Sequence, residues 1–462
     1  MHPAASDPRD GGVPREAGEP ERDGPRDGGA VRRVRASGSE AIGIDLGTSG
    51  CRACVLSPAG DVLGEARFPL SPPRRHGSGA SEQDPQIWRA AVLNVLRLVA
   101  PHLRGPGAPR VCVDATSASL LLSTPGGTPL GLALMYDDTR AGAEAAEIAG
   151  LAPADSPARG AGSSLAKLLY LGRRVSDRGP RLALHQADWI LGCLTGRFGI
   201  SDWNNCLKLG FDPASGSWPR WMGALELKGV HLPQVQAPGT LVGVISDAVC
   251  AATGLPPGSL AVAGTTDSTA AVIAAGPLED GDAVTCLGST LVLKVIGGNP
   301  LSAPRFGIYS HRFGDRWLIG GASNSGGAVL RRFFNDDQLR LLSAGMDPDR
   351  PSGLDYYPLT SPGERFPVND PQLPPRLMPR PADDRAFLQG LLEGIARIEA
   401  RGYRLLMRLG APPVRRVLTI GGGAANPTWM RIRRRLLGVE VAAAAHSEAA
   451  YGAALLALNG PL

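Results

Sequence analysis

Lysine is scarce in this 462-residue chain: four of its 48 basic residues are lysines, and the others are arginines. No apolar run approaches the ~18 residues that a membrane-spanning helix needs. The net charge of +5 is small for this length, which argues against a nucleic-acid or membrane-surface partner. These absences predict a soluble globular protein with no nucleic-acid and no membrane partner.

The seven cysteines are an odd number scattered along the chain, so we expect a reducing compartment rather than a secreted disulfide framework. The single C-x-x-C, Cys51 to Cys54, has no second Cys or His pair at zinc-ligand spacing. Because it lies in an apolar, strand-like segment, we interpret both cysteines as small core residues. The seven histidines include no H-x-x-x-H pair, which disfavours a histidine metal site.

Residues 1–38 combine Pro, Gly and charged residues with almost nothing to bury, which predicts a disordered tail. The tail lacks the apolar core of a signal peptide. Its seven acidic residues through Asp27 are untypical of an organelle transit peptide. We therefore expect the protein in the cytoplasm.

Short apolar segments joined by Gly-rich turns begin at Ala41 and predict three strands in an antiparallel meander. A similar succession recurs in the second half, where the turn at 288–290 matches the turn at 47–49, so we infer two related α/β lobes in tandem. A Pro-rich stretch over 351–381 is expected to be a surface loop packed on one lobe. It precedes a core-facing helix over 384–409. The expected strands cover 41–47, 51–57, 62–70, 282–288, 291–298, 308–313 and 316–324.

Four turns rich in Gly, Ser and Thr follow apolar strands directly, at 47–50, 264–266, 288–290 and 421–423. Small residues let backbone N–H groups approach an oxyanion and hydroxyls add donors, so such turns hold phosphates without lysine. One such turn is usually only a tight turn, but four in one chain favour a phosphate site. The chain has no G-x-x-x-x-G-K-[ST] loop and no G-x-G-x-x-G opening a helix after the first strand, which excludes a P-loop and argues against a Rossmann site.

Two aspartates accompany these turns. Asp45 lies inside an otherwise apolar strand just before the first turn, where a carboxylate is costly to bury unless it binds something. The second lobe has Cys286 or Leu287 at this place, so one lobe alone carries the charge, which suggests Mg²⁺ bound to a nucleotide. Asp267 follows the turn at 264–266 and starts a helix, where a helix N-cap is the alternative interpretation.

Together these residues predict ATP in a cleft between two lobes, with Mg²⁺ near Asp45 and Asp267 facing an acceptor hydroxyl. Phosphoryl transfer needs mainly positioning, charge neutralisation and a carboxylate that receives the hydroxyl proton. The residues expected to hold the phosphates are Thr48, Ser49, Ser289 and Thr290.

From about residue 41 onward the chain resembles the FGGY carbohydrate kinases, sugar kinases of the actin/hexokinase/Hsp70 superfamily. IGIDLGTSGCRACV resembles the family's first phosphate motif, GTTDSTAA the segment with its catalytic aspartate, and CLGSTLVLK the second phosphate motif. GGGAANPTWMRIRRRLLGVEV with SEAAYGAALLA resembles the adenosine-binding region. The resemblance implies a two-lobed, ribonuclease H-like α/β fold with duplicated mixed sheets, an N-terminal lobe over 39–276 and a C-terminal lobe over 277–462. It also implies Asp267 as the general base, and ATP contacts from Gly47, Thr48, Ser49, Gly288, Ser289, Thr290, Gly421, Gly422, Gly423 and Asn426.

Within the family, the pieces VDATSASLLL, SDWNNCLKLGFDP and GGASNSGGAVLRRFF are most similar to the D-ribulose kinases of cyanobacteria and plants. This likeness implies conversion of D-ribulose to D-ribulose 5-phosphate, with the sugar held by Asp45, Ser117 and Asp267. Asp45 would then serve both the sugar and Mg²⁺.

The sequence departs from the family at two places. The usual Trp-Asn-Asp-x-Arg motif reads Tyr-Asp-Asp-Thr-Arg over 136–140. The helix after the three glycines carries Arg431, Arg433, Arg434 and Arg435, which we interpret as a solvated face. Two alternatives stay open: a D-xylulose or other polyol kinase of the same fold, and, more remotely, a non-catalytic actin- or Hsp70-like protein gated by nucleotide.

Overall fold

A computed structural model describes residues 38–176, 179–277 and 279–462. The chain divides into a unit of residues 1–35 and a unit of residues 36–462, and the description concerns the second unit. The disordered tail expected over 1–38 falls almost wholly outside the described ranges. Within those ranges, no helix is long and apolar enough to cross a membrane.

The first large sheet has six strands in the order β13-β14-β6-β1-β2-β3. Strands β1, β2 and β3 form the expected antiparallel meander. On its other side β1 pairs in parallel with β6, and β6 pairs in parallel with β14. The strands are β1 (Ala41–Leu46), β2 (Gly50–Leu56), β3 (Val62–Pro69), β6 (Arg110–Ala115), β13 (Leu241–Val244) and β14 (Leu260–Thr266).

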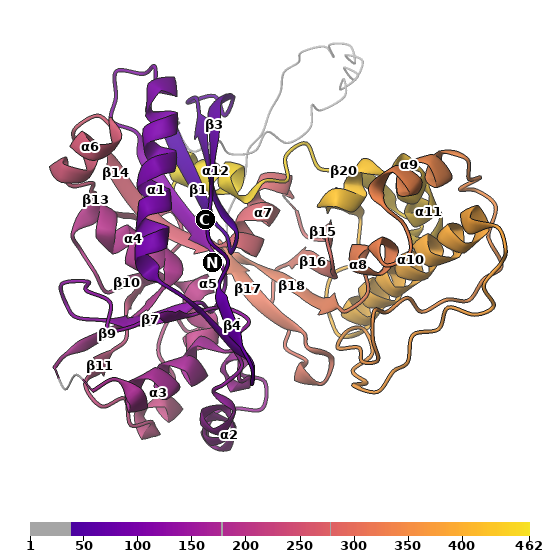
Figure 1. Ribbon diagram of the computed structural model, residues 1–462, viewed down its shortest axis with the longest axis horizontal. Coiled ribbons are helices and arrows are strands. Elements are labelled where there is room, and N and C mark those ends of the chain that lie inside the picture. Colours follow the sequence, from indigo (N-terminus) through magenta and orange to yellow (C-terminus); the bar gives the residue numbers. More distant parts are fainter. Residues whose placement is uncertain (1–37, 177–178, 278) are drawn as a thin grey trace, which may run out of the picture. The chain divides into compact units, whose positions relative to one another are not determined.

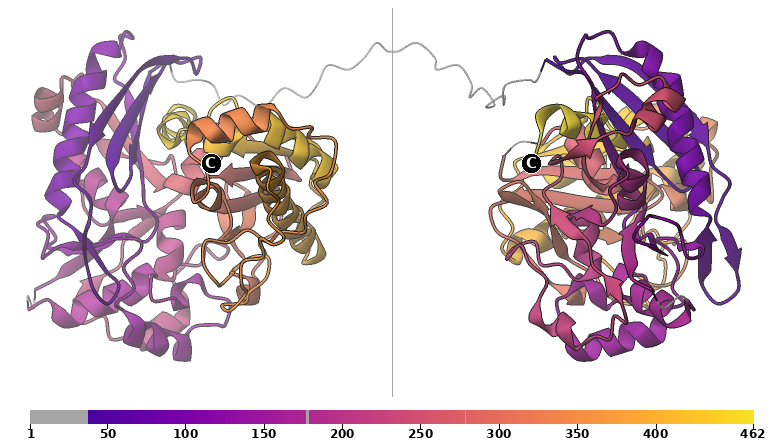
Figure 2. Two further views of the ribbon diagram at one scale, coloured as in Figure 1. Left: turned by 45° about the vertical axis from the view of Figure 1, so that its right-hand side comes forward. Right: turned by 90° about the vertical axis from the view of Figure 1, so that its left-hand side faces the viewer.

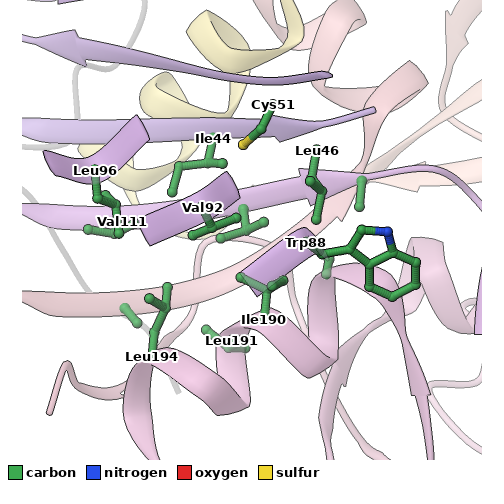
Figure 3. Close-up of a cluster of buried hydrophobic side chains, with 14 of the residues drawn as sticks. Ile44, Leu46, Cys51, Trp88, Val92, Leu96, Val111, Ile190, Leu191 and Leu194 are labelled. Atoms are coloured by element: carbon green, nitrogen blue, oxygen red, sulfur yellow. The ribbon is translucent and has the colours of Figure 1, made fainter. Parts of the chain in front are cut away.

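Apolar side chains gather between this sheet and helices α1 (Pro85–Val99) and α4 (Gln186–Thr195). Figure 3 shows this cluster, in which Trp88 and Ile190 come from the two helices and Ile44 from β1. Cys51 belongs to the same cluster, and Cys54 is also buried. Their interpretation as core residues is therefore confirmed. All seven cysteines are free thiols.

The second large sheet has the order β17-β18-β16-β15-β19-β20. The 25-residue helix α10 and helix α11 pack their apolar sides on it, and Figures 1 and 2 show both helices beside these strands. The strands are β15 (Asp282–Leu287), β16 (Leu291–Gly297), β17 (Tyr309–Phe313), β18 (Arg316–Ser323), β19 (Arg416–Ile420) and β20 (Glu440–Ala443); the helices are α8 (Gly327–Arg331), α9 (Asp336–Ala344), α10 (Asp384–Arg408) and α11 (Pro427–Leu437).

The two large sheets repeat one topology. In each, a strand pairs antiparallel with its successor on one side and parallel with a later strand on the other, so β1, β2, β3, β6 and β14 correspond to β15, β16, β18, β19 and β20. The internal duplication inferred from the two turns is thus present in the fold. The second sheet differs in one respect. Strand β17, which follows β16 in the chain, does not pair with β16 but lies at the sheet edge beside β18, and β16 pairs with β18 instead.

Residues between β3 and β14 add a third layer of short elements. A sheet with the order β11-β9-β7-β8-β5-β4 forms here, beside a parallel pair of β10 and β12. These elements are β4 (Arg74–His76), β5 (Ala80–Gln83), β7 (Leu120–Ser123), β8 (Ala133–Leu134), α2 (Gly142–Leu151), α3 (Ser164–Arg174), β9 (Arg181–His185), β10 (Ile200–Asp202), α5 (Trp203–Cys206), β11 (Val230–His231), β12 (Gln234–Gln236) and α6 (Asp247–Thr253).

Helices α7 (Asp267–Ala275) and α12 (Ala449–Asn459) pack closely on each other. A Cβ at Gly452 would lie 1.9 Å from the carbonyl oxygen of Ala270, so only glycine permits this approach. Helix α12 also packs on β1, where a Cβ at Gly43 would lie 2.0 Å from the carbonyl oxygen of Ala450. Val272 of α7 packs in turn with residues of β15 and β19. The two helices therefore connect the two large sheets.

Candidate active site

A polar row crosses the first sheet at the carboxyl end of β1. Asp45 stands opposite Arg52 of β2 and opposite Asp114 of β6, and Asp114 stands opposite Thr265 of β14. Arg52 Nη1 donates to Asp45 Oδ2 at 3.1 Å. Burial raises the pKa of Asp45, which is 6% exposed, while the Arg52 guanidinium lowers it. The strand carboxylate predicted from sequence is thus buried, and a single cation offsets its charge.

Asp114 was not singled out from the sequence, although it too is a charge inside an apolar strand. Its carboxyl group is fully buried, no N–H group among the described residues donates to either of its oxygens, and it lies close enough to the Asp45 carboxyl for the two groups to share a proton. Burial and the nearby charges of Asp45 and Asp267 raise the pKa of Asp114 well above its usual value. The signal that picked out Asp45 would have found Asp114 as well.

Asp267 is the first residue of α7, and the preceding Thr266 holds the N-cap position. Asp267 Oδ1 accepts the N–H of Ser268 at 2.6 Å. Asp267 is half-buried; its desolvation and the charge of Asp45 raise its pKa to about 6, against the lowering effect of the Ser268 N–H and the Lys208 ammonium. The residue is therefore a carboxylate near Asp45 with a pKa suited to accepting a proton near neutrality, rather than the helix cap.

Lys208 is a site residue that sequence reasoning missed. It lies on the one-turn 3₁₀ helix Leu207–Leu209. The segment before it is fixed by Asp202, which accepts from the N–H groups of Asn204 and Asn205. The Asn204 side chain donates to Thr265 Oγ1 at 3.1 Å, two residues before Asp267. The lysine is thereby anchored to the strand that leads into α7.

The scarcity of lysine is the signal that could have found this group. Three of the four lysines, Lys167, Lys208 and Lys294, lie in or beside the site region. The charge of Lys208 lowers the pKa of Asp267 and of Tyr309, and it also lowers the pKa of the other two lysines. Lys294 Nζ is buried and contacts His311 Nδ1 at 3.2 Å. The fourth lysine, Lys228, has a side chain 56% exposed. In a chain that uses arginine almost everywhere else, this grouping marks the site.

Ser117 lies in the turn after β6, where Ala118 has a positive φ of 70°. Lys167 of α3 holds this turn, since its Nζ donates to the carbonyl oxygens of Ala118 at 2.9 Å and Tyr136 at 3.2 Å. Burial lowers the pKa of this fully buried lysine to about 7. The turn with Ser117 and the 136–140 segment are thus fixed to one another.

The 136–140 segment, which departs from the family motif, is itself tightly bonded. Asp138 accepts the N–H of Ser81 at 2.9 Å, and Arg140 bridges Asp138 and Glu82 at 2.7 and 2.6 Å. Asp138 is fully buried. The altered motif therefore keeps a buried acid–arginine network, while Tyr136 is 46% exposed.

The first turn predicted to hold phosphate is the hairpin between β1 and β2. Gly47 N donates to the carbonyl oxygen of Gly50 at 3.0 Å, and the Ser49 carbonyl accepts from Leu70 N. Thr48 is half-buried and Ser49 is exposed. The turn directly follows the strand with Asp45, as the sequence predicts.

The second turn predicted to hold phosphate, 288–290, is held by the loop after β18. Gly327 N donates to the Gly288 carbonyl at 2.9 Å, and Ala328 N donates to the Ser289 carbonyl at 3.1 Å. Gly326 has a φ of 150°, and a Cβ there would lie 2.7 Å from the Ser289 carbonyl oxygen. The turn therefore lies against a loop that only glycine can form.

The glycines that follow β19 pack against Leu287, the last residue of β15. A Cβ at Gly421 would lie 2.9 Å from the Leu287 carbonyl oxygen, and one at Gly423 would lie 2.6 Å from Leu287 Cβ. Gly421 also has a positive φ of 83°. The structure thus brings the 288–290 and 421–423 turns together, which sequence spacing alone could not establish.

A cavity of about 460 Å³ opens where these two turns meet. This volume is in the range of small-molecule pockets. Helix α9 forms another wall, with Asp336 and Ser343 among its lining residues, and no motif in the sequence pointed to this wall. Of the predicted ATP contacts, Gly288, Gly422, Gly423 and Asn426 line the cavity.

Asn426 lines the cavity and also stabilises the start of α11. Its side chain caps α11 by accepting the N–H of Trp429 at 2.9 Å, and its amide donates to Ser343 Oγ at 2.9 Å. Asn426 therefore joins α11 to α9.

The arginines of α11 do not form one solvated face, contrary to our interpretation. Arg433 is fully buried and pairs with Glu399, whereas Arg431 is 59% exposed and pairs with Asp349. Arg433 follows the buried Trp429 by four residues, so the helical period places both on the core-facing side of α11.

The carboxylates of the first sheet are the candidate ligands for Mg²⁺. Among the described residues, no group of three or more His, Cys, Asp or Glu side chains is placed to hold a metal ion. Mg²⁺, however, usually keeps several waters and binds one or two carboxylates. Asp45, which is bonded to Arg52 through Oδ2, provides a hard oxygen ligand of this kind. The residues therefore fit a hydrated Mg²⁺.

The comparison with known protein families identifies the chain. Residues 41–274 match the N-terminal domain of the FGGY family of carbohydrate kinases, and residues 283–459 match its C-terminal domain. The chain belongs to the FGGY family. As a member, this FGGY kinase is a sugar kinase, and ATP is the co-substrate that kinases of this family use.

Curated relatives of this FGGY kinase carry several names. It is 23% identical over 437 residues to a xylulose kinase of Staphylococcus epidermidis, covering 91% of this chain and 87% of the relative. A xylulose kinase of Escherichia coli is 24% identical over 87% of this chain and 85% of its own. A gluconokinase of Bacillus licheniformis is 20% identical, over 91% and 87%.

Solved structures share the fold of this FGGY kinase. The crystal structure of xylulose kinase from Rhodospirillum rubrum has a TM-score of 0.78 at 24% identity, covering 90% of this chain and 89% of that one. The structure of Plasmodium falciparum glycerol kinase with ADP has a TM-score of 0.77 at 14% identity, over 90% and 88%. The two-lobed, ribonuclease H-like α/β fold expected from sequence is therefore confirmed.

Proposed function

We propose that this FGGY kinase transfers the γ-phosphoryl group of ATP to a hydroxyl of a ketopentose, with Asp267 as the general base. One observation carries this assignment. Asp267 begins α7 next to the charges of Asp45 and Lys208, and its pKa is raised to about 6. A carboxylate with that pKa is ionised at neutral pH and is still basic enough to accept a proton.

In the proposed step, the sugar hydroxyl oxygen forms a bond to the γ-phosphorus while the bond from that phosphorus to the β,γ-bridging oxygen breaks. The hydroxyl proton moves to the Asp267 carboxylate, and ADP leaves with the electron pair of the broken bond. The Lys208 ammonium lies within electrostatic reach of Asp267. Its charge offsets the negative charge that gathers around the transferred group.

The nucleotide would lie along the two turns of the second sheet. The cavity beside them suits an adenosine, and the Gly, Ser and Thr residues of 288–290 and 47–49 offer N–H and hydroxyl donors to phosphates. Asp45 would hold Mg²⁺, which on binding neutralises phosphate charge. Asp45, Ser117 and Asp267 would hold the sugar.

D-Ribulose is the ketopentose that we propose, because the segments 113–122 and 201–213 resemble D-ribulose kinases. D-Xylulose is the second candidate, and it is favoured by the several relatives that are xylulose kinases. The two sugars differ in the configuration of one hydroxyl-bearing carbon. We further propose lobes over 39–276 and 277–462. We also propose a cytoplasmic location, which the seven free thiols support.

The general base can be tested by Asp267→Asn. This change should lower kcat by about 10²- to 10⁴-fold and leave the Kd of Mg·ADP within twofold, because the base contacts the sugar rather than the nucleotide. Asp247→Asn is the matched control, since Asp247 is the first residue of α6 as Asp267 is of α7. Near-normal turnover of Asp267→Asn would show that the base is assigned wrongly.

The substrate can be tested by measuring ADP release with D-ribulose, D-xylulose, L-ribulose, glycerol and gluconate. We expect the highest kcat/KM with D-ribulose. A higher value with D-xylulose would assign the second candidate. Absence of sugar-stimulated turnover with all five would contradict the proposed reaction and favour a nucleotide-gated binding protein.

A further inference from the structure

A buried ion pair lies behind the nucleotide cavity and takes no part in the reaction proposed above. Arg433 of α11 and Glu399 of α10 are both fully buried. Arg433 Nε donates to Glu399 Oε2 at 2.7 Å, and Arg433 Nη2 donates to Glu399 Oε1 at 2.6 Å. This two-point geometry fixes the orientation of both side chains.

The pair is hydrogen-bonded to two threonines that stand opposite each other in the sheet. Thr285 of β15 and Thr419 of β19 are register partners. Thr285 Oγ1 donates to Glu399 Oε1 at 2.6 Å, and Arg433 Nη1 donates to Thr419 Oγ1 at 2.7 Å. The hydroxyl of Tyr403 lies 2.7 Å from Thr285 Oγ1. The ion pair thus spans two adjacent strands.

Each of these strands leads into one of the turns at the cavity. Thr285 lies three residues before Gly288, and Thr419 lies two residues before Gly421. The two turns contact each other through Leu287, against which Gly421 and Gly423 pack so closely that no Cβ would fit. A small shift of one strand along the other would therefore change the spacing of the two turns.

Helix α11, whose Arg433 is bonded to the sheet, also forms part of the cavity wall. Trp429 lies one helical turn before Arg433, lines the cavity, and donates from Nε1 to the Leu392 carbonyl of α10 at 3.1 Å. A Cβ at Gly423 would lie 2.8 Å from its ring. The position of α11 is thus fixed at Arg433 on the sheet and at Trp429 on the glycine turn.

We infer that the ion pair of Arg433 and Glu399 is a positioning device that sets the spacing of the two nucleotide turns. A buried ion pair is weak evidence for stability, because apolar residues of similar volume often serve as well. Its two bonds to strand hydroxyls instead give a defined register at the place where the nucleotide would lie. This inference rests on the nucleotide position proposed above.

The test removes the links and leaves the ion pair in place. Thr285→Val and Thr419→Val keep the side-chain shape but lose the hydroxyl, and a hydrogen bond to a charged group corresponds to a factor of about ten or more in an equilibrium constant. We expect the KM for ATP and the Kd of Mg·ADP to rise about 5- to 20-fold, with the KM for the sugar within twofold. Thr253→Val is the matched control, because its buried hydroxyl bonds only within α6.

A second variant separates positioning from stability. Replacing both charges, Arg433→Met with Glu399→Leu, avoids an unpaired buried ion, so the protein should fold. We expect this double variant to keep the sugar KM and still bind Mg·ADP at least fivefold more weakly. Wild-type affinity for Mg·ADP in the double variant would overturn the inference.

Each of the remaining outcomes supports or overturns the inference. The inference fails if both threonine variants keep their nucleotide constants within twofold, or if the nucleotide and sugar constants rise together. If the wild type phosphorylates a ketopentose and the variants match it, only the positioning inference fails. If no sugar is phosphorylated but the threonine variants weaken Mg·ADP binding, the proposed reaction fails and the positioning inference stands. If the wild type does not bind Mg·ADP, both fail.

Discussion

Single residues show which parts of the site the sequence can reveal. Asp45 was predictable because a carboxylate in an apolar strand is costly without a partner, and the structure places it opposite Arg52 and Asp114. Asp114 carries the same signal in its own strand. That the two face each other was not predictable, because parallel register between β1 and β6 is set by contacts distant in sequence.

At the residue scale, the first prediction concerns the pH dependence of the reaction. Asp267 must be ionised to accept a proton, and its pKa is raised to about 6. We therefore expect kcat/KM to be constant above this pH and to fall as the pH drops through it, approaching tenfold per unit. Initial rates with saturating ATP between pH 5 and 8 measure this profile.

The Lys208 ammonium provides a check on this assignment. Its charge lowers the pKa of Asp267, so Lys208→Met should move the acidic limb of the profile to higher pH. Lys228→Met, at an exposed lysine, should leave the limb in place. A limb that stays unchanged in Lys208→Met would mean that another group titrates.

Elements were largely predictable where the local pattern decides. The helix expected over 384–409 is α10, the strand–glycine–helix unit is β19 followed by α11, and the Pro-rich stretch over 351–381 has no helix or strand. The edge position of β17 was not predictable, because the same alternating pattern suits an edge strand or an inner strand. Arg433 was misjudged because four arginines in one helix resemble a solvated face.

At the element scale, the close approach of α7 and α12 leads to a stability prediction. Gly452→Ala would place a Cβ 1.9 Å from the carbonyl oxygen of Ala270, so the two helices must separate. Overpacking of this kind costs about 1–3 kcal/mol or more, and the apparent Tm should fall. Because Asp267 begins α7, kcat should fall as well.

Gly172→Ala in α3 is the control for this change. No atom lies within 4 Å of a Cβ at Gly172, and alanine favours helix over glycine by up to about 1 kcal/mol. Its apparent Tm should stay the same or rise. Differential scanning fluorimetry of both variants measures the contrast, and an unchanged Tm in Gly452→Ala would contradict the observed packing.

For the whole molecule, the duplicated topology was predictable from the two matched turns, because each Gly-rich hairpin marks the start of one sheet. The charges were duplicated only in part. Cys286 and Ile420 stand side by side in the second sheet, where the first sheet has Asp45 and Asp114. The first sheet thus carries a pair of acids where the second sheet carries Cys286 and Ile420.

At this scale we predict separate footprints for the two ligands. The cavity is lined by residues between Leu287 and Trp429, so Mg·ADP should slow amide hydrogen exchange mainly within 283–459. The ketopentose should slow exchange mainly within 41–274, where Asp45, Ser117 and Asp267 lie. Hydrogen–deuterium exchange measured by mass spectrometry tests this, with Mg²⁺ alone as the control. Protection by Mg·ADP confined to 41–274 would contradict the assigned nucleotide site.

The distribution of lysines has a practical consequence. Lys167 is fully buried, Lys294 is 9% exposed and Lys208 is half-buried, whereas the Lys228 side chain is 56% exposed. Amine-reactive dyes or surface-coupling reagents should therefore attach to one defined side chain far more readily than to the other three. Among the lysine side chains, Lys228 is thus the accessible handle for tethering or fluorescent tagging without engineering a cysteine, and the α-amino group of the chain is the other amine that reacts.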